Sequence, residues 1–401
     1  MARILFMNGG AEGHVNPTVS VVQELVQRGN EVVYFTTEYF RERLEKVGAE
    51  VRTYDFHRFF EGFLKHGIHP LDRVNGMLEG AEALIPYVLE EAKAKPFDYI
   101  VHDSMFGGGR LMAHLLQLPA INSSSSFAMT AAHFNHFIER LDAFVPSGPS
   151  EQQQAQADFD RLTAKLRRDY GYVIHSPYEA FFNPEPLTIV YTSRLFQPKG
   201  EDFDDSYKFV GPSVSARLHG ELEMPELAGK SVIYISLGTE FNKDIDFYRS
   251  CFEAFGGSGN TIVMSVGRQT EIESLGAIPD NFIVRPYVPQ LEVLQHARLF
   301  ITHGGMNSTN EGLSHGLPLV LVPQGADQPR VAERVAELGA GVALEKTELT
   351  ADLLRDMVNR VLETPSYREA AARVGESLRS AGGARQAADE IMKYVSQVNV
   401  G

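Results

Sequence analysis

Short apolar runs alternate with longer amphipathic segments along almost the whole chain, and this alternation constrains the fold more than any other feature. In the first half, the apolar runs cover residues 3–7, 31–36, 51–54, 99–102, 120–122 and 187–191. The segments between them have helical spacing. Asn16 has the character of a helix N-cap, Pro17 suits the first helical position, and Gly29 would follow the helix end. Repeated strand–helix–strand units predict a parallel sheet with helices on both faces.

The same alternation restarts at Ser231, with apolar runs over residues 232–236, 261–266, 299–302 and 319–322. Residues 211–230 between the two halves have weak periodicity and several prolines and glycines, which is typical of a linker. We therefore expect an α/β protein with two Rossmann-like, doubly wound parallel-sheet domains, residues 1–210 and 231–380, that face each other across a cleft. In such sheets, ligands bind at the carboxyl ends of the strands.

The charge balance and the single cysteine exclude several classes of protein. The chain has 52 acidic and 37 basic residues, a net charge of −15, so nucleic acid and anionic membranes are poor partners. No apolar run reaches the ~18 residues of a membrane span. Cys251 is the one cysteine, which precludes an intrachain disulfide and indicates a reducing compartment. We expect a cytoplasmic protein whose cysteine is a buried structural thiol.

The most informative motif follows the predicted strand at 299–302. His303-Gly304-Gly305 precedes a predicted helix, whose first N–H groups and positive dipole end suit a diphosphate. Glu311, one turn further, offers acceptors for ribose hydroxyls. Tyr287, upstream, offers an aromatic face for a planar base. Asp327 and the amide Gln328, after the next predicted strand, suit sugar hydroxyls.

Residues 287–328 resemble, nearly end to end, the nucleotide-sugar signature box of UDP-dependent glycosyltransferases. The resemblance extends to residues 13–17, 191–194, 209–213 and 236–239. The chain is similar to bacterial macrolide-type glycosyltransferases that glucosylate flavonoids and other natural products. This resemblance implies the two-domain GT-B fold, hexosyl transfer with inversion, and a C-terminal helix, residues 381–401, that packs back on the N-terminal domain.

The resemblance also implies roles for the residues of the box. Tyr287, where plant members usually carry Trp, would stack on uracil, and the Val288 backbone would bind the base. The remaining donor-binding positions are Gln290 and Glu311 for the ribose, His303, Gly305, Asn307, Ser308, Ser236 and Thr239 for the diphosphate, and Asp327 and Gln328 for the glucose. From the first half, Ser124 is the expected donor contact, with a helix cap or a plain polar loop as the alternative.

His14 matches the general base of the family and Asp103 matches its orienting acid. A hydroxyl that attacks an anomeric carbon must lose its proton, and histidine titrates near neutral pH. A carboxylate on the other ring nitrogen fixes the tautomer. No metal or other cofactor is expected besides the UDP-sugar substrate. Three Asp-x-Asp patterns, at 158–160, 202–204 and 244–246, are the kind that an acidic chain produces by chance.

Two aromatic segments, residues 56–70 and 127–144, fit either core-facing helix stripes or the lining of an apolar acceptor pocket. The candidate acceptor-binding residues are Phe56, Phe60, Met105, Phe106, Phe127 and Phe134. We expect the acceptor to be a small aglycone such as a flavonoid, phenol or macrolide, and the sugar to be glucose.

Three alternatives remain at this stage. A dinucleotide-dependent oxidoreductase would use Gly9–Gly13 as its phosphate loop, but the spacing is not G-x-G-x-x-G. The N-acetylglucosamine transferase of peptidoglycan synthesis has a similar first loop, but it needs a lipid-facing patch that the first half does not show. A non-catalytic sugar-nucleotide sensor would have no need of both His14 and Asp103.

Overall fold

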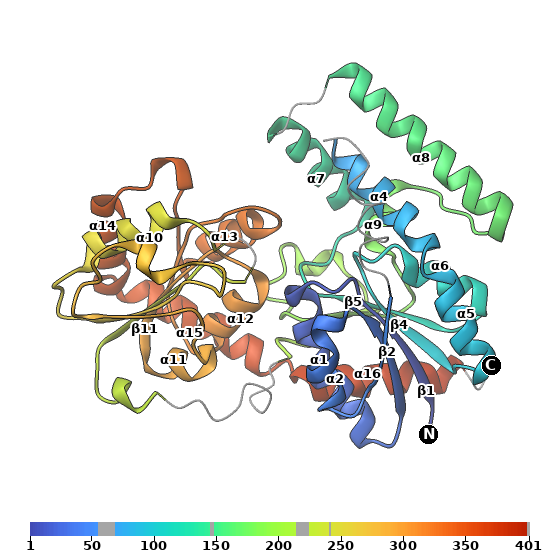
Figure 1. Ribbon diagram of the computed structural model, residues 1–401, viewed down its shortest axis with the longest axis horizontal. Coiled ribbons are helices and arrows are strands. Elements are labelled where there is room, and N and C mark those ends of the chain that lie inside the picture. The colour runs from blue at the N-terminus through green and yellow to red at the C-terminus, as the bar shows by residue number, and fades with distance from the viewer. Residues whose placement is uncertain (55–68, 145–147, 214–223, 240–241, 399–401) are drawn as a thin grey trace. The chain divides into compact units, whose positions relative to one another are not determined.

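The computed structural model describes residues 1–54, 69–144, 148–213, 224–239 and 242–398. The chain divides into two compact units (Figure 1). Unit 1 contains Met1–Tyr191, Glu201–Ser213 and Ala384–Gly401, and unit 2 contains Thr192–Gly200 and Val214–Gly383.

Unit 1 is built on a parallel sheet that has seven strands within the described residues, in the order β3-β2-β1-β4-β5-β6-β7. The strands are β1 (Arg3–Met7), β2 (Glu31–Thr36), β3 (Glu50–Thr53), β4 (Tyr99–Asp103), β5 (Ala120–Ser124), β6 (Thr188–Val190) and β7 (Tyr207–Phe209). The helices are α1 (Glu12–Gln27), α2 (Arg41–Glu45), α4 (Pro70–Glu82), α5 (Ile85–Ala94), α6 (Gly108–Leu116), α7 (Ala131–Phe144), α8 (Pro149–Tyr170), α9 (Pro177–Phe182) and α16 (Gly383–Val398), with the 3-10 turns η1 (Glu38–Phe40) and η2 (Gly200–Asp202).

Unit 2 repeats this plan, with six parallel strands in the described part of the chain, in the order β10-β9-β8-β11-β12-β13. The strands are β8 (Val232–Ser236), β9 (Thr261–Ser265), β10 (Phe282–Arg285), β11 (Ala297–Thr302), β12 (Leu319–Leu321) and β13 (Gly341–Ala343). The helices are α10 (Ile245–Phe255), α11 (Gln290–His296), α12 (Met306–Ser314), α13 (Gln328–Glu337), α14 (Ala351–Glu363) and α15 (Pro365–Arg379), with the 3-10 turns η3 (Pro225–Leu227), η4 (Ile272–Leu275) and η5 (Lys346–Glu348).

The expected fold class, two parallel-sheet domains, is confirmed, and β1, β2 and β8 have the predicted bounds. The central strands are buried along their whole length because helices cover both faces of each sheet. The strands β7, β10 and β13 were not predicted. They are short and only partly buried, so their apolar signal is weak.

The predicted start of the first helix is wrong. The helix α1 begins at Glu12, with Ala11 as N-cap, and Pro17 lies inside it. A proline inside a helix removes one backbone hydrogen bond, which in this helix would go to the carbonyl of Gly13. The Asn8 amide donates to the His14 carbonyl at 3.1 Å and supports this first part of the helix. His14 therefore lies in the first turn of α1 rather than in the loop before it.

The C-terminal helix α16 belongs to unit 1, and Figure 1 shows it in red beside the strands of that unit. Its buried face consists of Ala387, Ala388, Ile391 and Val395. On its exposed side, the Asp389 carboxylate accepts a hydrogen bond from the Arg28 guanidinium, at 2.6 Å. A segment far away in the sequence thus completes the packing of unit 1.

Candidate active site

In unit 1, the expected general base, His14, and its expected orienting acid, Asp103, lie together at the point where the strand order reverses. The strands β1 and β4 are neighbours there, and ligands of open α/β sheets bind at such switch points. His14 follows β1, and Asp103 is the last residue of β4. His14 Nδ1 lies 2.8 Å from Asp103 Oδ2. The structure therefore brings together two groups that are 89 residues apart in the sequence.

Asp103 is held firmly in this position. Its side chain is only 2% exposed, against 26% for that of His14. The backbone N–H of Met105 donates to Asp103 Oδ1 at 2.8 Å, so the second carboxylate oxygen faces the imidazole. An acceptor at Nδ1 keeps the proton on that nitrogen and makes Nε2 the basic one. The pair has the geometry of a general base with its orienting acid.

Ser125, which was not among the predicted site residues, also contacts His14. Its Oγ lies 3.0 Å from His14 Nδ1, and its side chain is buried. Ser124, the predicted donor contact, is buried as well, and its hydroxyl donates to the Ser126 carbonyl at 3.2 Å. Four consecutive serines give no signal that distinguishes one from the next, so the sequence could not identify Ser125. A donor contact from Ser124 stays a prediction.

Four of the six candidate acceptor-binding residues lie in the described part of the chain. Phe56 and Phe60 lie outside the described residues. Phe106, Phe127 and Phe134 are buried, and the Phe134 ring packs at 5.2 Å from that of Phe181. This burial favours the core alternative for these three aromatic side chains. Met105 is half-buried beside the His14–Asp103 pair, and its contact with an acceptor stays a prediction.

In unit 2, two loops meet at the corresponding switch point, between β8 and β11. The loop after β8 carries Gly238 and the loop after β11 carries His303 and Gly305. A Cβ atom at Gly238, whose φ is +77°, or at Gly305 would collide with the imidazole of His303. Both glycines are thus required for the ring to fit between the loops. Burial lowers the pKa of His303 to about 4, so the ring is neutral at pH 7.

The helix α12 starts directly after this loop, with Gly305 as its N-cap and no side-chain cap. N–H groups in the first turn of a helix lack intrahelical acceptors and carry the positive end of the dipole. Asn307 and Ser308 are in this turn, where the sequence predicts the diphosphate. Ser236 accepts a hydrogen bond from the Gly238 N–H at 3.3 Å, and Thr239 is exposed on the same loop. The arrangement fits a diphosphate well.

Gln290 and Glu311, the predicted ribose ligands, are bonded to each other. The Gln290 amide Nε2 donates to Glu311 Oε2 at 2.5 Å and to Ser308 Oγ at 3.3 Å. Burial raises the pKa of Glu311 to about 7, although the hydrogen bond from Gln290 acts in the opposite direction. The Tyr234 hydroxyl donates to Gln290 Oε1 at 3.1 Å. The sequence analysis did not predict this contact, because Tyr234 lies in a buried strand among apolar residues.

The predicted base platform, Tyr287, is 41% exposed, and Val288 beside it is buried. The Arg268 guanidinium lies 5.8 Å from the centroid of the Tyr287 ring. An exposed ring next to buried backbone can stack on a planar base.

The predicted sugar ligands lie at the start of α13, Asp327 as its N-cap and Gln328 as its first residue. Gln328 is buried, and its Oε1 accepts hydrogen bonds from the N–H groups of Gln324, at 2.7 Å, and Gly325, at 3.2 Å. Gln328 therefore also shapes the loop that precedes α13. Asp327 is half-buried at the N-cap of α13, and its charge acts on His303.

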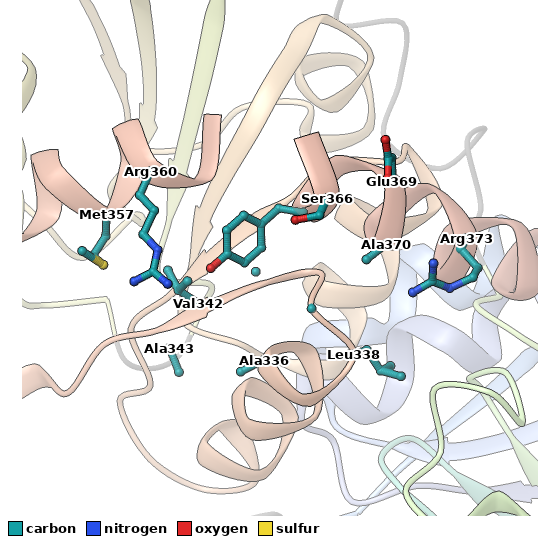
Figure 2. Close-up of a pocket in the computed structure, with 13 residues that line it drawn as sticks. Ala336, Leu338, Val342, Ala343, Met357, Arg360, Ser366, Glu369, Ala370 and Arg373 are labelled. Carbon is teal, nitrogen blue, oxygen red and sulfur yellow. The ribbon is translucent and has the colours of Figure 1, made fainter. Parts of the chain in front are cut away.

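Other features of the molecule lie apart from these residues. Unit 2 has a cavity of about 740 Å³ whose lining residues come from α13, β13, α14 and α15 and their connections (Figure 2). None of the predicted site residues lines it. Among the described residues, no three His, Cys, Asp or Glu side chains form a metal-binding cluster.

Cys251 is buried, which raises the pKa of its thiol. No helix in the described parts of the chain is long and apolar enough to cross a membrane.

Comparison with known proteins identifies the family. Residues 251–394 match the family described as Erythromycin biosynthesis protein CIII-like, C-terminal domain. The chain is 36% identical over 402 residues to "Uncharacterized UDP-glucosyltransferase YojK" of Bacillus subtilis (strain 168), covering 99% of this chain and 98% of the relative. It is 31% identical over 397 residues to "Oleandomycin glycosyltransferase" of Streptomyces antibioticus, covering 97% of this chain and 90% of the relative.

A solved structure, that of the calicheamicin glycosyltransferase CalG4, superposes on the chain with a TM-score of 0.86 at 32% sequence identity, and 99% of both chains is covered. The relatives are glycosyltransferases, so the oxidoreductase and sensor alternatives are set aside. With relatives more than 30% identical along nearly its whole length, the protein belongs to the bacterial natural-product glycosyltransferases, enzymes of the GT-B fold that use nucleotide-sugar donors.

Proposed function

We propose that the enzyme transfers glucose from UDP-glucose to a hydroxyl of a small aromatic or polyketide acceptor, with inversion at the anomeric carbon and without a metal ion. The observation that carries this proposal is the contact of 2.8 Å between His14 Nδ1 and the buried Asp103 carboxylate. The printed names of the relatives, a UDP-glucosyltransferase and an oleandomycin glycosyltransferase, support the donor and the class of acceptor.

In the proposed reaction, His14 Nε2 takes the proton of the acceptor hydroxyl while that oxygen attacks the anomeric carbon. The bond between this carbon and the phosphate oxygen breaks, and its electron pair leaves with UDP. Asp103 stabilises the imidazolium that forms on His14. One displacement from the face opposite the leaving group inverts the configuration.

The departing UDP carries additional negative charge, which the proposal assigns to groups of unit 2. Preorganised donors at a helix N-terminus stabilise such charge without reorganisation. The first turn of α12 supplies backbone N–H groups that lack intrahelical acceptors and carry the positive end of the helix dipole. These donors would do the work that a divalent cation does in other glycosyltransferases.

A screen of purified, EDTA-treated enzyme tests the proposal. UDP-glucose, UDP-N-acetylglucosamine and TDP-glucose are each offered with a panel of phenols, flavonoids and macrolides. We expect a β-glucoside from UDP-glucose, recognised by the large coupling constant of its anomeric proton. An α-glucoside would contradict inversion. Activity that EDTA abolishes and Mg²⁺ or Mn²⁺ restores would contradict metal independence.

The same screen decides between this proposal and the peptidoglycan-type alternative. If UDP-N-acetylglucosamine were the preferred donor and a lipid-linked saccharide the only acceptor used, the alternative would replace the proposal. The similarity to macrolide glycosyltransferases along nearly the whole chain favours the small, hydrophobic acceptor.

A further inference from the structure

The side chain of Gln290 is held at both ends of its amide. Nε2 donates to Glu311 and Ser308, and Oε1 accepts from the Tyr234 hydroxyl. The carboxylate of Glu311 can only accept when ionised, so the NH₂ end must face it. The donor at the opposite end, Tyr234, then selects one of the two possible orientations of the amide.

Tyr234 itself has almost no freedom to move. It is 1% exposed in the middle of β8, and its ring stacks on that of Phe300, with 4.6 Å between the centroids and 15° between the planes. Phe300 is its direct partner in the neighbouring strand β11. Burial raises the pKa of the Tyr234 hydroxyl, so it stays protonated and able to donate. The sheet thus holds the Tyr234 hydroxyl in a fixed position next to Gln290, and the side chains of Ser236 and Ser265 also hydrogen-bond to this hydroxyl.

We propose that Tyr234 is a positioning residue for the donor nucleotide, because it fixes the amide of Gln290 and so sets the geometry with which Gln290 and Glu311 bind the ribose. Through this geometry, the site selects ribonucleotide over 2′-deoxyribonucleotide donors. This inference rests on the proposed function, in which these two residues hold the ribose. In this inference, Tyr234 acts on the ribose through the amide of Gln290, to which its hydroxyl donates. Its removal should therefore affect the recognition of ribose hydroxyls and leave the base and diphosphate contacts in place.

The variant Tyr234→Phe removes the hydroxyl and keeps the stacked ring. A hydrogen bond contributes about 0.5–1.5 kcal/mol net, so UDP should bind about 2- to 13-fold more weakly. The affinity for 2′-deoxy-UDP, which lacks one of the hydroxyls concerned, should change by less than about twofold on the same reasoning. The ratio of the two affinities in one variant is a readout that general damage to the fold would not move.

Tyr34→Phe is the matched control. Tyr34 is likewise buried in a strand and stacked on a phenylalanine, Phe6, at 4.8 Å and 8°. Its hydroxyl bonds to Thr18 at 2.8 Å, in unit 1 and not in the donor site. The variant removes the same atom from the same kind of environment. It should keep the wild-type preference for UDP, even if its melting temperature falls as much as that of Tyr234→Phe.

Isothermal titration calorimetry of UDP and 2′-deoxy-UDP with the full-length wild type and both variants gives the answer. A preference for UDP that Tyr234→Phe loses and Tyr34→Phe keeps supports the inference. Equal weakening of both nucleotides by Tyr234→Phe, an unchanged ratio, or a wild type without preference each overturns it. Failure of the proposed function looks different, because the wild type would then bind neither nucleotide or transfer no sugar from UDP-glucose.

Discussion

The substitution His14→Ala isolates the proposed proton transfer. It removes the imidazole that Asp103 holds at 2.8 Å, and it leaves unchanged unit 2, which carries the predicted donor residues other than Ser124. A positioned general base contributes about 10²–10⁴-fold to a rate, or roughly 3–5 kcal/mol of barrier. Asp103 is 2% exposed and its other oxygen is fixed by Met105. Because the ring is so firmly oriented, we expect a loss at the upper end of this range for an aliphatic alcohol acceptor.

The size of the loss should depend on the acidity of the acceptor. A phenol or thiol that is already ionised at the pH of the assay needs no base, so the loss of kcat with such an acceptor should be only about tenfold or less. We would measure kcat and KM for wild type and variant with a series of substituted phenols and one aliphatic alcohol at fixed pH. Calorimetry should find UDP binding within about twofold of wild type. His175→Ala, at an exposed histidine of the same unit, is the matched control and should leave all these values unchanged.

The outcome that would refute this reasoning is a loss of equal size for acidic and non-acidic acceptors. It would mean that His14 orients the acceptor and that another group takes the proton. Weaker UDP binding in His14→Ala would also contradict the assignment of donor binding to unit 2.

Asp103→Asn tests the second half of the pair. The Met105 N–H will keep the amide oxygen where Oδ1 is now, so the NH₂ group must face His14 Nδ1. This moves the ring proton to Nε2, the nitrogen that should act as base. We expect a loss within about tenfold of that of His14→Ala for non-acidic acceptors. A rate close to wild type would show that the tautomer does not matter.

Three further predictions concern other parts of the chain. Because the pKa of Glu311 is raised to about 7, its carboxylate protonates as the pH falls below that value, and UDP-glucose should bind more weakly at pH 6 than at pH 8. A wild-type affinity that does not change with pH, or an equal pH dependence in Glu311→Gln, would contradict this. Deletion of residues 387–401 removes buried side chains that contribute several kcal/mol to the free energy of unfolding, so it should lower the melting temperature by about 10 °C or more. The control Asp389→Ala breaks only an exposed ion pair and should shift the melting temperature by about 2 °C or less. Gln328→Ala should lower turnover of UDP-glucose and leave UDP binding nearly intact; an equal loss of affinity for UDP and UDP-glucose would mean that Gln328 only shapes its loop.

The sequence predicts the architecture because hydrophobic pattern and glycine placement are local properties. The strands β1, β2 and β8 were predicted to the residue, since long buried runs of apolar residues have sharp ends. The start of α1 was not, because the cap signal of Asn16 and Pro17 is also local. The Asn8 amide, from the loop before the helix, supports the earlier start, and a cap rule does not consider it.

The sequence by itself determined the residue types of the two sites: a histidine after the first strand of unit 1, and a histidine, two glycines and a carboxylate around the start of α12 in unit 2. These are close in the chain and belong to one motif each, so their spacing is readable. Only the tertiary structure decided which side chains meet from different strands. The family resemblance led us to expect Asp103 beside His14, but the physical cause is tertiary: parallel pairing places the end of β4 beside that of β1. The contact of Ser125, rather than Ser124, with the imidazole was not expected and depends on the side-chain directions after β5. The register of β8 with β11 places Tyr234 opposite Phe300, and the hydroxyl of Tyr234 meets the amide of Gln290 at the start of α11. Hydrogen bonds between distant strands depend on register and on the direction of each side chain, and neither is encoded in any short stretch of sequence.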